Sequence, residues 1–216
     1  MKKREKLGIV VLISGNGSNL QAIIDAIANG LPIKINAVIS NCDNAYGIER
    51  ARLAGIKTHV IEHQNFSSRS AFDLELQNTI NDYKPELIAL AGFMRRLSSA
   101  FVSHFKNKII NIHPSLLPKF PGLHTHKKAL EAKERTHGAT IHFVTEELDA
   151  GPIVDQTQLA IAPNETVEQL EKRVRALEHQ LYPKVLAWFA ENRVSLDKDN
   201  QVVINPSLAP ELGPNT

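Results

Sequence analysis

Runs of apolar residues alternate along the first half of the chain with segments whose apolar positions recur every three or four residues. The first pattern is typical of strands buried on both faces of a sheet, and the second of amphipathic helices. The apolar runs predict strands over residues 7–13, 33–40, 57–61, 86–91 and 108–113. The intervening segments predict helices over residues 19–28, 47–54, 68–83 and 99–105. This alternation predicts βαβ crossovers and a mostly parallel central sheet flanked by helices.

The pattern changes after residue 113. Residues 114–125 contain three prolines and one glycine and therefore predict a loop, and an ordered loop of this length is often functional. Beyond it we expect a helix near 127–134 and strands at 139–146 and 153–161. Thr166 and Gln169 form a capping box that begins a long amphipathic helix, in which Pro183 is expected to cause a kink or a break. The α/β sheet thus carries a C-terminal β-β-α extension.

Composition and charge narrow the class of protein. The chain has 216 residues, and its 25 Lys and Arg nearly balance its 23 Asp and Glu. Nucleic-acid-binding proteins usually carry a strong, clustered positive charge, so this balance argues against nucleic-acid binding. The single cysteine, Cys42, excludes an intramolecular disulfide and a Cys-rich zinc module. The apolar runs fall far short of the roughly 20 residues that a membrane-spanning helix needs. We therefore expect one cytoplasmic domain that binds neither nucleic acid nor membrane.

The segment Gly15-Asn16-Gly17-Ser18-Asn19 lies between the first predicted strand and the first predicted helix. Small residues let the backbone approach a ligand, and N–H groups at a helix start favour a phosphate. The segment matches neither the P-loop nor the dinucleotide fingerprint, because Leu20 stands where the last glycine is required. A tight turn is the alternative, but the carboxyl end of a parallel strand favours a phosphate site.

Asn111 and His113 end the fifth predicted strand and, being two residues apart, share one face. An amide beside an imidazole can stabilise an oxyanion, and the imidazole can move protons near neutral pH. Asp149 lies in a predicted turn and would supply a carboxylate that favours the imidazolium form of the ring. The spacing alone does not bring Asp149 to His113. Purely structural roles for both residues remain open at this point.

The other histidines are scattered, and we expect them to be structural. His124 and His126 lack a cysteine or carboxylate partner nearby, so they do not predict a metal site.

Four segments of the chain resemble the phosphoribosylglycinamide formyltransferase family, which are folate-dependent enzymes of purine biosynthesis. The segments are IVVLISGNGSNLQAIIDA at 9–26, LAGFMRRLSSAFVSHF at 90–105, NIHPSLLPKFPGLHTH at 111–126 and HGATIHFVTEELDAGP at 137–152. With LEHQLYP at 177–183 they extend the resemblance over about residues 7–190. The Asn-x-His-Pro-Ser-Leu-Leu-Pro segment is common to folate-dependent formyltransferases, whereas S-G-N-G-S-N and P-G-L-H-T-H are specific to this branch.

The resemblance implies a Rossmann-like formyltransferase fold and transfer of the formyl group of 10-formyltetrahydrofolate, as co-substrate, to the amine of glycinamide ribonucleotide, without a metal. It implies that Asn111 and protonated His113 stabilise the tetrahedral oxyanion and that Asp149 keeps His113 protonated. The implied nucleotide-binding residues are Gly15, Asn16, Gly17, Ser18, Asn19, Arg175, Ala176, Leu177 and Glu178. The implied folate-binding residues are Arg69, Met94, Arg95, Arg96, Leu97, Asn111, Thr145, Glu146, Glu147, Leu148 and Asp149. Arg96 departs from the family pattern, which has an apolar residue there.

The expected organisation is one domain over residues 1–205, with a nucleotide-binding half over about 7–107 and a folate-binding and catalytic half over about 108–195. Residues 206–216 are expected to form a mobile tail, and the protein to be a monomer or weak homodimer. Two alternatives remain: a formyltransferase for another amine, such as a sugar nucleotide or methionyl-tRNA, and a non-catalytic nucleotide- or folate-binding protein. Weak net charge and the few residues after the last helix argue against methionyl-tRNA.

Overall fold

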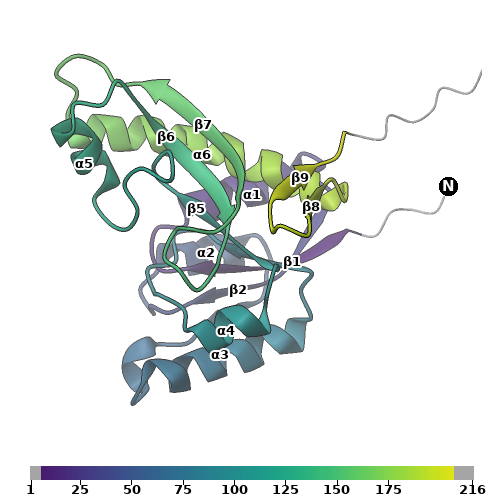
Figure 1. The fold of residues 1–216 in the computed structure, drawn as a ribbon. Helices are drawn as coiled ribbons and strands as arrows, with labels where there is room; N and C mark the ends of the chain where they lie inside the picture. The colour runs from purple at the N-terminus through teal and green to yellow at the C-terminus, as the bar shows by residue number, and fades with distance from the viewer. Residues whose placement is uncertain (1–5, 207–216) are drawn as a thin grey trace, which may run out of the picture.

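The computed structural model describes residues 6–206, which are built around one seven-stranded sheet of order β3-β2-β1-β4-β5-β6-β7 (Figure 1). The strands are β1 (Leu7–Ile13), β2 (Ile33–Ser40), β3 (Thr58–Val60), β4 (Leu87–Leu90), β5 (Ile109–His113), β6 (Thr136–Phe143) and β7 (Ile153–Ala160). The first five run parallel, whereas β6 and β7 pair antiparallel. The predicted α/β fold with a mostly parallel sheet is confirmed.

Helices cover both faces of the sheet. They are α1 (Ser18–Ala28), α2 (Tyr46–Leu53), the 3-10 turn η1 (His63–Asn65), α3 (Arg69–Tyr83), α4 (Ser99–His104), α5 (Thr125–Glu131) and α6 (Val167–Ala190). Alternate side chains of β1 enter different cores: Ile9, Val11 and Ile13 pack with α1, α2 and α6, while Val10 and Leu12 pack with α3 and α4. Figure 1 shows α6 and the α3–α4 pair on opposite sides of the sheet. None of the described helices is long and apolar enough to cross a membrane.

The structure decides two features of the C-terminal region that the sequence left open or did not predict. Pro183 does not break α6, which is one helix of 24 residues. Proline removes a single intrahelical hydrogen bond, and the buried Leu181, Tyr182, Val185 and Leu186 on either side of it hold both halves against the sheet. A second, two-stranded sheet of β8 (Val194–Leu196) and β9 (Val202–Ile204) was not predicted, because strands of three residues carry little periodic signal. The predicted tail falls almost entirely on residues 207–216, which lie outside the described residues.

The loops after β1, β4 and β5 leave the same edge of the sheet, because these three strands are parallel neighbours. They contain residues 14–17, 91–98 and 114–124, respectively. Residues 144–152, which join the antiparallel β6 to β7, leave the sheet at its other edge, where Phe143 pairs with Ile110, and fold back so that Asp149 reaches His113 at the end of β5. Carboxyl edges of this kind are where open α/β sheets bind ligands.

The hydroxyl of Tyr182 docks α6 onto this edge by donating a 2.9 Å hydrogen bond to the carbonyl of Leu90 inside the core. Tyr182→Phe should therefore lower the free energy of unfolding by about 0.5–1.5 kcal/mol, because it removes a hydrogen bond made inside the core. Urea denaturation measures the loss. Tyr46→Phe, at a tyrosine that is 53% exposed, is the matched control and should change the free energy by less than about 0.5 kcal/mol. Equal effects of the two changes would contradict the docking role.

Candidate active site

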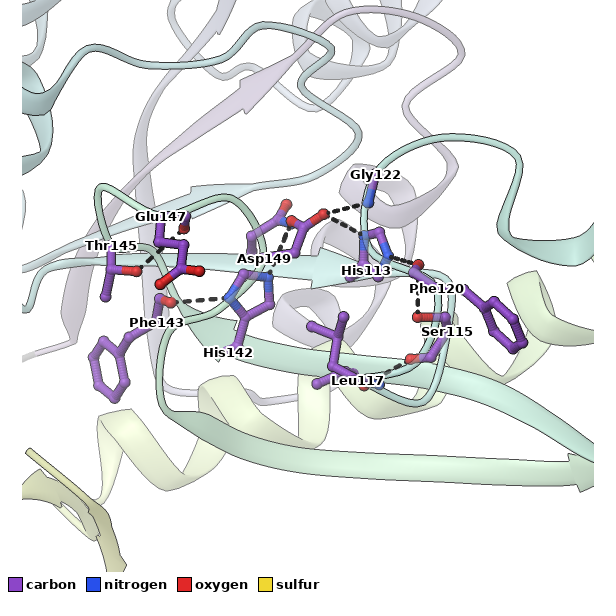
Figure 2. A network of polar contacts seen from close by, with 12 residues as sticks. His113, Ser115, Leu117, Phe120, Gly122, His142, Phe143, Thr145, Glu147 and Asp149 are labelled. Carbon is purple, nitrogen blue, oxygen red and sulfur yellow. Dashed lines mark hydrogen bonds and ion pairs between the residues drawn. The ribbon is translucent and has the colours of Figure 1, made fainter. Parts of the chain in front are cut away.

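His113 ends β5 as a buried side chain whose two ring nitrogens both face oxygen acceptors. Nε2 lies 3.0 Å from the carbonyl oxygen of Phe120, and Nδ1 lies 3.5 Å from Oδ2 of Asp149 (Figure 2). Carbonyl and carboxylate oxygens only accept hydrogen bonds, so the ring can donate to both only as the imidazolium. The tertiary structure thus brings Asp149 to His113, which the sequence spacing could not establish.

The segment between β6 and β7 holds Asp149 in this position. The two ends of this segment are joined by a 2.9 Å hydrogen bond from the Phe143 N–H to the Pro152 carbonyl. The backbones approach so closely there that a side chain at Gly151 would overlap the Phe143 carbonyl. Asp149 adopts a positive φ of 52°, a conformation that Asp tolerates better than most residues. Its Oδ2 also accepts a 2.8 Å hydrogen bond from the Gly122 N–H. The carboxylate therefore joins the loop after β5 to the loop after β6.

His142 is the site residue that the sequence analysis missed. The register of β5 and β6 pairs it with Asn111, so the two side chains are cross-strand neighbours. Its Nδ1 lies 2.9 Å from the Phe143 carbonyl oxygen, and its Nε2 lies 3.3 Å from Nδ2 of Asn111 and 3.8 Å from Oδ1 of Asp149. Burial lowers the pKa of His142. The neutral ring donates from Nδ1 and accepts at Nε2, which orients the amide of Asn111 and leaves its second N–H for a ligand.

A cavity of about 700 Å³ opens beside these residues. Met94, Arg95, Arg96, Asn111, His113, Leu148 and Asp149 are among its lining residues. A smaller cavity of about 100 Å³ adjoins it and adds Leu97, His142, Thr145, Glu146 and Glu147. Every residue of the two loop segments predicted to bind folate therefore lines one of the two. Arg69 does not; it is exposed at the first position of α3.

A third cavity, of about 390 Å³, is lined by the whole of Gly15–Asn19 together with Arg175 and Glu178 of α6. Ala176 and Leu177, which were predicted alongside them, do not line it. This cavity shares Gly92, Met94 and Pro114 with the 700 Å³ cavity, so the two adjoin. Two ligands bound side by side would meet near Pro114, the residue that follows His113.

Comparison with known proteins identifies the family. A family model described as formyl transferase matches residues 7–186. The chain belongs to the formyl transferase family. An Escherichia coli phosphoribosylglycinamide formyltransferase is 48% identical over 206 residues, which are 95% of this chain and 97% of that protein. The human trifunctional purine biosynthetic protein adenosine-3 is 39% identical over 201 residues, 93% of this chain and 20% of its own length.

Solved structures agree with the family assignment. A phosphoribosylglycinamide formyltransferase from Coxiella burnetii is 57% identical, has a TM-score of 0.90, and the match covers 93% of this chain and 94% of that one. A glycinamide ribonucleotide transformylase from Symbiobacterium toebii also has a TM-score of 0.90, at 41% identity, with 94% and 96% covered.

Ser14 joins the two loops that the sequence analysis predicted to bind the ligands of this formyl transferase. Its N–H donates to the Gly92 carbonyl at 3.1 Å, and its Oγ accepts from the Met94 N–H at 2.7 Å and donates to Oδ1 of Asn41. Ser14 directly precedes the loop Gly15–Asn19, whereas Met94 begins the predicted folate segment. One serine therefore connects the two loops. Neither its residue type nor its neighbours in sequence could reveal this connecting role.

His126 of α5 and His137 of β6 form a pair in this formyl transferase. Nδ1 of His126 lies 3.1 Å from Nε2 of His137, and burial lowers the pKa of His126 and lowers that of His137 to about 4. Both rings are therefore neutral near pH 7, and one donates to the other. Within residues 6–206 no group of three or more His, Cys, Asp and Glu side chains is arranged to hold a metal ion.

Glu178 is buried at the base of the 390 Å³ cavity, where its Oε2 accepts a 2.8 Å hydrogen bond from Nδ2 of Asn19. Burial raises the pKa of Glu178 above its ordinary value. The folded state therefore holds this proton more tightly than the unfolded chain, and its stability falls as pH rises through the unfolded pKa toward the folded one.

Glu178→Gln should remove this dependence, because Gln is uncharged and still accepts from Asn19. The variant should match the wild type in unfolding free energy at pH 4 and exceed it at pH 7, as measured by urea denaturation at both pH values. Glu75→Gln, on the exposed surface of α3, should show no such change with pH. A Glu178→Gln difference that is the same at both pH values would rule out the effect.

Proposed function

We propose that this chain transfers the formyl group of 10-formyltetrahydrofolate to the amine of glycinamide ribonucleotide, giving formylglycinamide ribonucleotide and tetrahydrofolate, in de novo purine biosynthesis. The observation that carries the proposal is the pair of adjoining cavities, which share Gly92, Met94 and Pro114 and of which the larger is lined by Asn111 and His113. Relatives that match nearly the whole chain bear the name of this activity. The substrates are small molecules, and 10-formyltetrahydrofolate is the co-substrate of the family.

The nucleotide is assigned to the 390 Å³ cavity. The loop Gly15–Asn19 at the start of α1 would donate its N–H groups to the phosphate, since a helix N-terminus favours an anion. Arg175 and Glu178 would contact the rest of the nucleotide from α6. Ala176 and Leu177 belong to the same segment of α6 but lie outside the cavity lining, so we assign them no direct contact.

The folate is assigned to the 700 Å³ cavity and its smaller neighbour. Residues 94–97 and 145–149 would bind its ring system, together with Asn111. Arg95, Arg96 and the exposed Arg69 are cationic, which suits the carboxylates of the glutamyl tail. Arg96 lines both cavities although the family pattern has an apolar residue there, so its long side chain alters the lining without closing the site.

The reaction begins when the lone pair of the glycinamide amine attacks the formyl carbon, and the carbonyl π electrons move to oxygen. The second N–H of Asn111 and the charge of the His113 imidazolium stabilise that oxyanion. Collapse of the adduct re-forms the carbonyl and breaks the bond from the formyl carbon to N10, which gains a proton from His113 or from water. The attacking nitrogen loses one proton through water toward Asp149, so no net proton is produced.

The proposed organisation is one domain over residues 1–205, whose halves at about 7–107 and 108–195 supply the nucleotide loop and the catalytic strand. We propose that it acts in the cytoplasm as a monomer or weak homodimer. The near balance of charge supports small-molecule partners over nucleic acid.

A direct assay tests the proposal. Purified protein mixed with 10-formyltetrahydrofolate and glycinamide ribonucleotide should release tetrahydrofolate, and the release should depend on the nucleotide. Omission of the nucleotide is the control, because it measures spontaneous deformylation. Nucleotide binding without transfer would instead point to another formyl acceptor or to a binding protein.

His113→Ala should lower kcat by about 10²–10³ or more, because it removes a charged donor from the oxyanion. Binding of the nucleotide, measured by calorimetry, should be nearly unchanged, since the loop Gly15–Asn19 is untouched. His104→Ala, at an exposed histidine of α4, should keep wild-type kcat. A turnover of His113→Ala close to that of the wild type would refute the assigned role.

A further inference from the structure

Arg50 of α2 forms hydrogen bonds with the loop Gly15–Asn19 from outside the nucleotide cavity. Its Nε donates to the backbone carbonyl of Asn16 at 2.9 Å, and its Nη2 donates to the side-chain Oδ1 of the same residue at 3.1 Å. A single planar guanidinium thus holds both the backbone and the side chain of one loop residue. Only an arginine has two donors in a rigid fork with this spacing.

The guanidinium is itself fixed by two neighbours. Its Nη1 donates to Oε1 of Gln21 on α1 at 3.1 Å, and its Cζ lies 4.8 Å from the ring centroid of Tyr46, one turn earlier on α2. Arg50 lines the groove between α1 and α6, beside Asp25 and His179, and is absent from the lining of the nucleotide cavity. The side chain therefore faces the back of the loop, where it would not contact a phosphate bound at the front.

A second contact from α2 reinforces the first. The N–H of Gly47 donates to the carbonyl of Gly15 at 3.0 Å. A Cβ at Gly47 would lie 2.5 Å from Cδ1 of Ile13 and 3.1 Å from Cα of Gly17, so α2 rests directly on the loop. The carbonyls of Gly15 and Asn16 are consequently both directed to α2. Carbonyl oxygens repel an anion, and turning them backward leaves the loop N–H groups for the front.

We propose that Arg50 is a positioning residue for nucleotide binding, which holds the carbonyls of the loop away from the phosphate without contacting it. The inference rests on the proposed function, in which this loop binds the nucleotide phosphate. In this proposal Arg50 strengthens nucleotide binding through the geometry of its two hydrogen bonds to Asn16 and not through its positive charge. The binding of 10-formyltetrahydrofolate should not depend on Arg50.

Steady-state kinetics of Arg50→Met, Arg50→Lys and the control Arg52→Met test it. Arg50→Met should raise the KM for glycinamide ribonucleotide about tenfold, while the KM for 10-formyltetrahydrofolate stays within about twofold. Arg50→Lys keeps the charge but only one of the two contacts with Asn16, so it should recover part of the loss. Arg52 is exposed on the same helix, and its substitution should leave both KM values unchanged.

Three outcomes would overturn the inference: an unchanged nucleotide KM in Arg50→Met, an equal rise in both KM values, or wild-type behaviour of Arg50→Lys. The last would mean that charge alone acts. If Arg50→Met fails to fold, Tyr46→Leu removes the ring beneath the guanidinium and should raise the nucleotide KM in the same selective way. An inactive wild type would refute the proposed function instead, and calorimetry of nucleotide binding to the wild type and to Arg50→Met would then test the inference by itself.

Discussion

The contact between Asp149 and His113 constrains how the chain folds from β5 to β7. It requires β6 to return antiparallel to β5 and the chain after β6 to fold back to the end of β5. The same carboxylate accepts the Gly122 N–H, so it also ties down the proline-containing loop after β5. A carboxylate with few water contacts needs such partners, since burying it without them is costly. One carboxylate thus holds the loops after β5 and β6 together.

Two imidazoles flank this carboxylate in opposite roles. The ring nitrogens of His113 face two oxygen acceptors, Phe120 and Asp149, whereas His142 donates to Phe143 and has its pKa lowered by burial. A neutral His142 can accept from Asn111, and a charged His113 can stabilise negative charge beside it. The antiparallel register thus orients the amide of Asn111 on the strand that also carries His113, and an amide donor beside an imidazolium is an arrangement that can stabilise an oxyanion.

The loops predicted to bind the ligands are held by residues that do not line the 700 Å³ cavity. Arg50 and Gly47 hold the loop Gly15–Asn19, and Ser14 joins that loop to Met94. At the other end of the folate segment, the buried Asp73 of α3 accepts a 2.7 Å hydrogen bond from the Ser98 N–H. Supports of this kind keep irregular backbone in one conformation, so that binding does not have to supply the ordering free energy.

The sequence by itself determined the α/β class, the bounds of β1 and β2, the capping box at Thr166 and the residue types at the site, because these depend on local periodicity and short motifs. Only the tertiary structure decided that Asp149 meets His113, that His142 pairs with Asn111, and that Arg50 reaches Asn16 across 34 positions. It also decided that α6 continues through Pro183 and that a short hairpin follows it. The physical reason is that strand register, loop return and buried packing are set by contacts between residues distant in sequence, which no local pattern encodes.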